Sequence, residues 1–250
     1  MTTHLDSEVQ LSFDPWAFER CYLVADILHD DFEAPYMEYA LLGLSTESNP
    51  FHVVATPLLP GQRVTSATVE QPGRQVLRMR REIEVLSKRM RQQLLPITFI
   101  HRHPGGCDAS RTDDAFLRGV FIDQVATVIN FEDVRVVEAT EHYRDCPEIQ
   151  RHFRESSTDG RGPVALRSDC GIAFSLIVNR KREHRLYGVR KSTCASCGRE
   201  EVDYIPARLA QDSHSWIPPL DLALLRRRLV EEIEAKISFK RGGGTAEEIL

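Results

Sequence analysis

The chain has 250 residues, of which 42% are hydrophobic and 28% charged, as is usual for a globular protein. Its formal net charge of −5 argues against a general nucleic-acid binder. No apolar run reaches the roughly 18–20 residues that cross a bilayer, and the N-terminus lacks the basic and apolar regions of a signal peptide. We therefore expect a cytoplasmic protein that binds neither nucleic acid nor a membrane, which six cysteines without a dense framework also favour.

The first 70 residues predict several strands and one helix. A short strand is expected at 9–13, and Asp14-Pro15 is a good helix start because a capping carboxylate precedes a proline in the first turn. After an acidic turn, residues 38–44 predict a buried strand that begins with a carboxylate, Glu38. Two further strands are expected at 51–56 and 64–69.

The clearest helix is expected from about 74 to 95, where apolar residues recur at intervals of three or four, and Pro96 is expected to end it. The apolar run 97–100 then predicts a strand that leads directly into two histidines. A second helix is expected over 111–124, with Ser110 as its cap. Two more strands are expected at 125–130 and 134–139.

The rest of the chain predicts a loop, a hairpin and a tail. The polar segment 141–163 predicts a long loop or an insertion, and 171–179 with 184–190 predict a hairpin around a basic turn. Alternating helices and strands indicate an α/β (α+β layered) domain over residues 1–190. Residues 191–250 are expected to form a small C-terminal extension with a Cys-x-x-Cys pair, a helix over about 220–237 and a disordered tail.

The most informative run is His101-Arg-His103-Pro-Gly-Gly-Cys-Asp-Ala-Ser110-Arg-Thr-Asp113-Asp114. Alternate side chains of a strand point to one face, so His101 and His103 are expected to project together. Two imidazoles and a carboxylate are a ligand set that suits a catalytic Zn²⁺ with an open coordination position. Ser110, three residues before Asp113, is expected to lie beside that metal.

This run resembles the active-site motif of the JAB/MPN (JAMM) zinc metalloproteases. Its Ser-Arg-Thr-Asp sequence resembles that of the bacterial, deubiquitinase-like branch in particular. The resemblance covers roughly residues 9–190 and implies a central mixed β-sheet flanked by helices. It also implies that His101, His103 and Asp113 bind the zinc, that Glu38 moves protons and that Ser110 stabilises the oxyanion. Asp114 is the alternative third ligand, because the family's usual spacing from the second histidine reaches it, and Glu33 is the nearest rival of Glu38.

The resemblance implies a zinc-dependent isopeptidase or peptidase that cleaves after a ubiquitin-like modifier. Partners would be that ubiquitin-like protein, its conjugates and the activating or conjugating enzymes of the same operon, in a bacterial pathway such as anti-phage defence. Two alternatives are a peptidase that trims a sulfur-carrier ubiquitin-like protein and a non-catalytic interaction scaffold. We further expect the extended substrate tail to lie in a groove shaped by 104–109 and 141–163.

Cys194-x-x-Cys197 has the spacing of metal ligands, but a structural zinc needs four of them. Cys146, Cys170, His214 or a second chain are candidates to complete such a site. The alternatives are a tight turn with two inert thiols and a redox pair.

Overall fold

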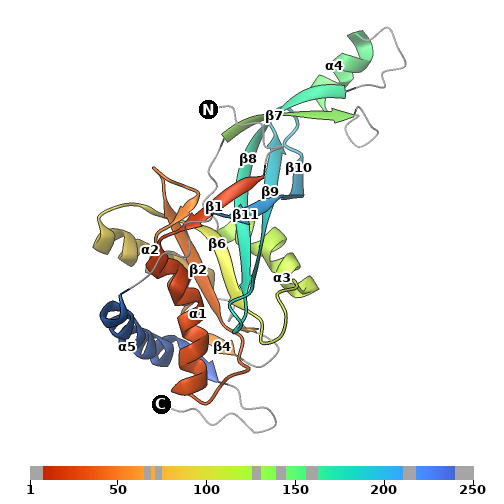
Figure 1. Cartoon of the computed structure of the whole chain (residues 1–250). Helices are drawn as coiled ribbons and strands as arrows, with labels where there is room; N and C mark the ends of the chain where they lie inside the picture. The colour runs from red at the N-terminus through yellow and green to blue at the C-terminus, as the bar shows by residue number, and fades with distance from the viewer. Residues whose placement is uncertain are drawn as a thin grey trace.

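The computed structural model describes residues 8–64, 69–70, 75–125, 131–138, 145–155, 163–210 and 218–239. These residues form a layered α/β fold in which helices cover both faces of a mixed β-sheet (Figure 1), as the alternation of elements predicts. No helix among them is long and apolar enough to cross a membrane. The expected disordered tail from residue 242 onward lies outside the described residues, as does the strand expected at 125–130 apart from Val125, which ends η1.

The elements follow one another in chain order with these bounds: β1 Val9–Phe13, α1 Pro15–Asp30, β2 Ala40–Thr46, β3 His52–Val53, β4 Gln62–Val64, β5 Val69–Glu70, α2 Gln75–Met90, β6 Leu94–Arg102, α3 Arg111–Ala115, the π-helical segment η1 Phe116–Val125, β7 Phe131–Glu138, α4 Pro147–Glu155, β8 Pro163–Val178, β9 His184–Cys194, β10 Glu200–Ile205, β11 Ala207–Leu209, α5 Pro219–Lys236 and β12 Ile237–Phe239. The predicted helix over 111–124 is thus α3 continued by η1. The predicted hairpin is formed by β8 and β9 around the basic turn.

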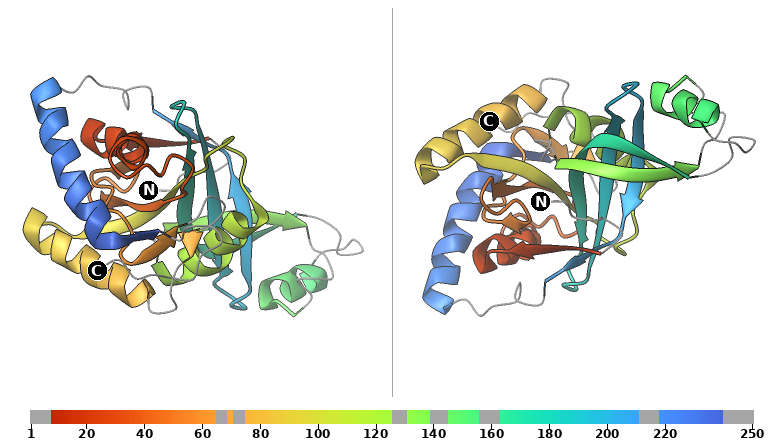
Figure 2. Two further views of the ribbon diagram at one scale, coloured as in Figure 1. Left: turned by 90° about the horizontal axis from the view of Figure 1, so that it is seen from below. Right: turned by 90° about the horizontal axis from the view of Figure 1, so that it is seen from above.

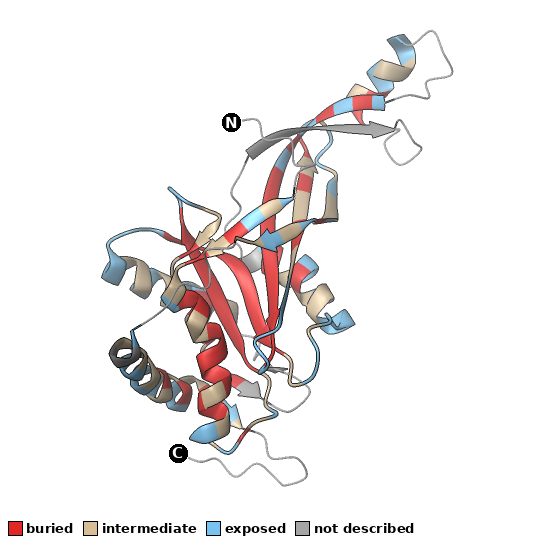
Figure 3. Cartoon of the chain, in the orientation of Figure 1, coloured by how far each residue is buried: buried red, intermediate tan, exposed pale blue. Residues whose placement is uncertain are grey.

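The main sheet has the strand order β10-β9-β8-β6-β2, and β7 pairs with the first half of β8. Only β6 and β8 are parallel; β2 runs antiparallel to β6, and β9 runs antiparallel to both β8 and β10. Two small three-stranded sheets, β11-β1-β3 and β12-β4-β5, lie beside it. The centre of the main sheet is fully buried (Figure 3), so both of its faces are packed.

The two faces carry separate apolar clusters because neighbouring side chains of a strand point in opposite directions. On one face, Leu41 and Phe174 belong to the cluster that includes α1 and α5. On the other face, Ala40 and Leu42 pack with Phe99 and with residues of α2 and η1. Figure 2 shows the corresponding layers, with α1 and α5 on the same side of the sheet.

The C-terminal residues are part of this core. The boundary expected near residue 190 lies inside β9, β10 extends the main sheet, and β11 pairs with β1 in parallel. Leu229 and Ile233 of α5 are fully buried against α1. Glu232 also accepts the Leu58 N–H at 3.0 Å and forms ion pairs with Arg20 and Lys236. The segment after residue 190 therefore completes the domain.

Pro96 does not end helix α2, contrary to the sequence prediction. The helix ends at Met90, where Arg91 takes a φ of 55° and the Ser87 carbonyl accepts the Gln92 N–H at 3.1 Å. Pro96 lies inside β6, beside a register shift between β2 and β6. Such an irregularity tolerates a residue that has no N–H to donate.

The segment 141–163 is not a single long loop, because it contains helix α4. This helix packs on the first half of β8 through a small apolar cluster of Cys146, Ile149, Val164, Leu166 and Cys194, with Phe153 against it. Figure 1 shows α4 at one end of the long β7–β8 arm, far from α3. The described part of this segment therefore does not border the histidine motif, whereas 141–144 and 156–162 lie outside the described residues.

Candidate metal centre

Strand β6 presents the two histidines on the face that α3 covers. His101 is buried and stacks on Phe99, with ring centroids 5.1 Å apart, and His103 lies next to it at 4.9 Å. Arg102, between them, points to the opposite face. The alternation expected from the sequence therefore brings both imidazoles together.

Helix α3 supplies the third side chain. Ser110 is its N-cap: the Ser110 hydroxyl accepts the Asp113 N–H at 3.2 Å, and Asp113 Oδ2 accepts the Ser110 N–H at 2.8 Å. This reciprocal capping box satisfies two backbone donors and fixes the rotamer of the carboxylate. As a result, Asp113 Oδ2 lies 3.4 Å from His101 Nε2 and 3.2 Å from His103 Nε2.

This arrangement fits a zinc ion. Ligand atoms bound at about 2.0–2.1 Å in a tetrahedron are roughly 3.3 Å apart, which matches both distances to Asp113. Neither ring nitrogen of the buried His101 makes a hydrogen bond, and such unsatisfied nitrogens are costly unless they find a partner. Two imidazoles and one carboxylate leave a fourth position open, as in catalytic zinc sites.

The electrostatics favour the metal-binding protonation states of His101 and Asp113. Burial lowers the pKa of His101, against the opposing charge of Asp113, which favours the neutral ring that a metal needs. Burial alone would raise the pKa of Asp113, but contacts with His101, His103 and Ser110 outweigh it and hold that pKa well below its usual range. Contact with Asp113 raises the pKa of His103, so a proton competes for that ring in the absence of a metal.

Glu38 lies beside this group. It precedes β2, whose Ala40 pairs with His101, so Glu38 continues the row of side chains that face α3. Burial raises the pKa of the Glu38 carboxyl, an effect that the charge of His103 opposes and that of Asp113 reinforces. Glu33 is exposed, with a φ of 52°, in the turn after α1. The structure therefore brings Glu38 to the histidines.

Asp114 points away from the histidines. Its carboxylate accepts a hydrogen bond from the hydroxyl of Tyr204 on β10 and lies 3.9 Å from the Arg118 guanidinium. Arg118 in turn lies 5.3 Å above the Tyr204 ring. These contacts dock α3 and η1 on β10, so the adjacent Asp113 is the acid that faces the two histidines.

Sequence reasoning missed Arg102. This arginine is 1% exposed, and its guanidinium donates to the carbonyls of Met37 at 2.8 Å and Pro35 at 2.6 Å. Its backbone N–H also donates to the Tyr39 carbonyl at 2.9 Å. Arg102 therefore ties the segment on both sides of Glu38 to the strand that carries the histidines. The signal in the sequence was an arginine between the two histidines, at the end of a largely apolar strand.

The loop after His103 is held by the β8–β9 turn, which the sequence did not indicate. The His103 N–H donates to the Val178 carbonyl at 3.0 Å, and Asn179 donates to the Gly105 carbonyl at 3.4 Å. Arg185 forms an ion pair with Asp108. Both ends of the loop are therefore fixed, the second by the capping box.

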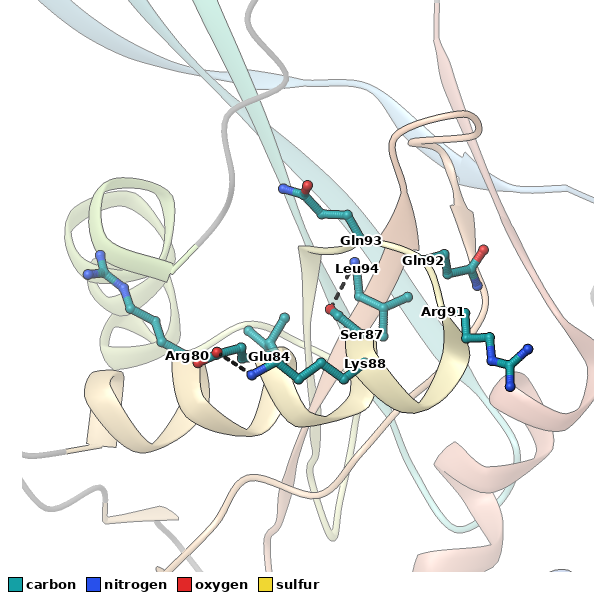
Figure 4. Close-up of a pocket in the computed structure, with 9 residues that line it drawn as sticks. Arg80, Glu84, Ser87, Lys88, Arg91, Gln92, Gln93 and Leu94 are labelled. Carbon is teal, nitrogen blue, oxygen red and sulfur yellow. Dashed lines mark hydrogen bonds and ion pairs between the residues drawn. The ribbon is translucent and has the colours of Figure 1, made fainter.

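A separate hollow lies on α2 and at the start of β6 (Figure 4). Its lining is mostly charged or polar, with an exposed Lys88–Glu84 ion pair, and it contains none of the metal-site residues. We assign no role to it. Neither the protein-family models nor the curated proteins compared with this chain match it.

Proposed function

We propose that this protein is a zinc-dependent metallopeptidase of the JAMM type, which cleaves the isopeptide or peptide bond after a ubiquitin-like modifier. The observation that carries the proposal is the convergence of His101, His103 and Asp113 beside a second carboxylate, Glu38. Amide hydrolysis needs both parts, because a metal site alone lacks a group that transfers protons to the leaving amine.

Each residue has a role in this proposal. Zinc held by His101, His103 and Asp113 would supply a water of lowered pKa and an electrophile for the carbonyl oxygen. The Glu38 carboxylate accepts a proton from the attacking water and returns it to the amine nitrogen as the C–N bond breaks. The Ser110 hydroxyl accepts the Asp113 N–H, so its own O–H proton is available to the developing oxyanion.

The substrate class rests on the resemblance of the motif to the bacterial, deubiquitinase-like JAMM proteins. We infer a ubiquitin-like protein and its conjugates as substrates, with activating and conjugating enzymes as partners in a pathway such as anti-phage defence. Six free cysteines among the described residues favour a reducing compartment such as the cytoplasm. Added Cβ atoms at Gly105 and Gly106 would meet nothing within 4 Å, so no described residue packs against this part of the loop.

The test is cleavage of a panel of linear and isopeptide-linked fusions of ubiquitin and of bacterial ubiquitin-like proteins. The zinc-loaded wild type is expected to release the modifier with an intact C-terminus, and His103→Ala is expected to release none. Cleavage restricted to a free modifier with an extended tail would instead favour the trimming of a sulfur carrier. An inert wild type that binds conjugates with zinc in place would favour the scaffold alternative.

A further inference from the structure

Three cysteine side chains meet at the opposite end of β8. Cys194 and Cys197 belong to the β9–β10 turn, and Cys146 immediately precedes α4. Their sulfur atoms all lie within 4.8 Å of one another, against about 3.8 Å for thiolates bound at 2.3 Å to one tetrahedral zinc. Of the partners considered from sequence, Cys146 joins the pair, Cys170 lies on β8 against Ser192, and His214 lies outside the described residues.

The turn between the paired cysteines has the backbone of a metal-binding loop. Gly198, with a φ of 70°, follows Cys197 directly and donates its N–H to the Cys194 carbonyl at 2.8 Å. This left-handed conformation favours glycine and closes the turn tightly. The backbone N–H groups of Ser196 and Cys197 also contact the Cys194 sulfur, so the turn holds that side chain in place.

The backbone also places Cys146 at the start of α4. Its carbonyl accepts the Gln150 N–H at 2.9 Å, so Cys146 occupies the N-cap position of the helix. The close approach of the three sulfur atoms therefore brings the start of α4 to the β9–β10 turn.

The apolar packing around the cluster is small, so a bound metal would stabilise the position of α4. Helix α4 has nine residues, a length at which an isolated helix is marginal in water. In the described structure its apolar contacts to β8 are limited to a small cluster that includes Ile149, Phe153 and Leu166. A cross-link between the start of α4 and the β9–β10 turn would compensate for this small core.

We propose that Cys146, Cys194 and Cys197 bind a second, structural zinc ion that fastens α4 to the main sheet. Three thiolates supply three of its four ligands, and water takes the fourth position. Such a site is independent of the histidine centre, because it shares no residue with it. Nothing in this proposal depends on catalysis or on the identity of the substrate.

The experiment uses the full chain with His101→Ala and His103→Ala, purified under reducing conditions, so that the histidine centre holds no metal. Elemental analysis is expected to find about one zinc per chain, and adding Cys197→Ser is expected to remove it. Cys197 is exposed, so its replacement does not disturb the core. Cys170→Ser, a buried cysteine outside the cluster, is the matched control and is expected to keep the zinc.

Two further readouts separate a metal site from a purely structural effect. Co²⁺ in place of zinc is expected to give a thiolate-to-cobalt charge-transfer band, which Cys197→Ser abolishes and Cys170→Ser keeps. Stripping the metal is expected to remove hydrogen-exchange protection from residues 147–155 and to leave that of α1 unchanged. Equal zinc with and without Cys197→Ser, a disulfide among the three thiols in the purified protein, or unchanged exchange at α4 would each overturn the proposal.

Discussion

The two candidate metal centres lie at opposite ends of one strand, β8. His101 pairs with Ile177 near its end, and Cys194 pairs with Ser168 in its first half. Ser168 and Ile177 are nine residue steps apart, which corresponds to roughly 30 Å at about 3.3 Å per residue. A single element therefore positions both groups while keeping them too far apart to share a ligand.

The difference lies in what surrounds the ligands. The histidine centre combines nitrogen and oxygen donors with a nearby carboxylate, Glu38, and a hydroxyl, Ser110, that reacting atoms could use. The cysteine cluster has sulfur donors, backbone N–H partners and an apolar lining from α4 and β8. The ligands alone do not distinguish a reactive metal from a structural one, whereas the neighbouring groups do.

The largest effect is expected from removing the histidine centre. His101→Ala with His103→Ala is expected to abolish hydrolysis and one zinc per chain, while the cobalt–thiolate band remains. Zinc content and hydrolysis are measured on the same preparation. Equal zinc in the wild type and in a variant that lacks His101, His103 and Asp113 would show that the histidine group binds no metal.

Removing the proton acceptor is expected to have the next largest effect. Glu38→Gln keeps the shape of the side chain, so turnover is expected to fall by roughly 10²–10⁴-fold while both metal sites stay filled and substrate still binds. Steady-state kinetics and zinc analysis check this. Glu33→Gln is the control, and normal turnover in Glu38→Gln with loss in Glu33→Gln would move the role to Glu33.

Arg102 tests whether the position of Glu38 depends on the opposite face of the sheet. Arg102→Met keeps the apolar stem but leaves the Pro35 and Met37 carbonyls without donors. A displaced carboxylate is expected to lower kcat by up to about 10²-fold with little change in KM or zinc content. The variant Arg102→Lys retains the charge but lacks the planar guanidinium group. Its kcat is expected to lie between that of the wild type and that of Arg102→Met. A change in KM alone would contradict a positioning role.

Asp114 is expected to matter much less than Asp113. Asp113→Ala removes a ligand and is expected to abolish both zinc at the histidine centre and activity. Asp114→Ala loosens only the docking of α3 on Tyr204, so its cost in zinc affinity is expected to be about 10-fold. Competition with a zinc chelator measures both variants, and the reverse order would make Asp114 the ligand.

The smallest effect on catalysis is expected from the far end of β8. Cys146→Ser is expected to leave turnover unchanged and to alter only the exchange protection of α4, because the cysteine cluster does not touch the histidine centre. Turnover measured at saturating substrate checks this. A large loss of turnover in a folded variant would show that the two ends are coupled.

The sequence correctly predicted features that depend on neighbouring residues, such as helix caps and the alternation of side chains along a strand. Asp14 caps α1 as expected, with its carboxylate 2.9 Å from the Trp16 N–H, and Ser110 caps α3. The period of two in β6 was sufficient to place His101 and His103 on one face. Glu38 could be proposed only through the resemblance to a known motif, because its proximity to His103 depends on how β2 pairs with β6.

Features that depend on distant partners were missed. Helix α4 was hidden in a polar segment because Ile149 and Phe153 provide too few apolar residues for a clear period. Pro96 was wrongly predicted to end the preceding helix. It lies in β6 instead, because a register shift between β2 and β6 accommodates a residue without an N–H. Cys146 was not missed, but the sequence offered it only as one of several candidates to join Cys194 and Cys197, because about 50 positions separate it from Cys194 and only the fold brings the sulfur atoms together.

The contact between α1 and α5 has a consequence for synthesis of the protein. Leu11 and Ile27 near the start of the chain share a core cluster with Leu229 and Ile233 near its end. At about 5–20 residues per second, a ribosome takes roughly 10–40 s to make the 200 residues between them. During that time α1 can pack only on strands that are already made, and the part of its apolar surface that α5 covers stays exposed to aggregation and to chaperones until α5 emerges.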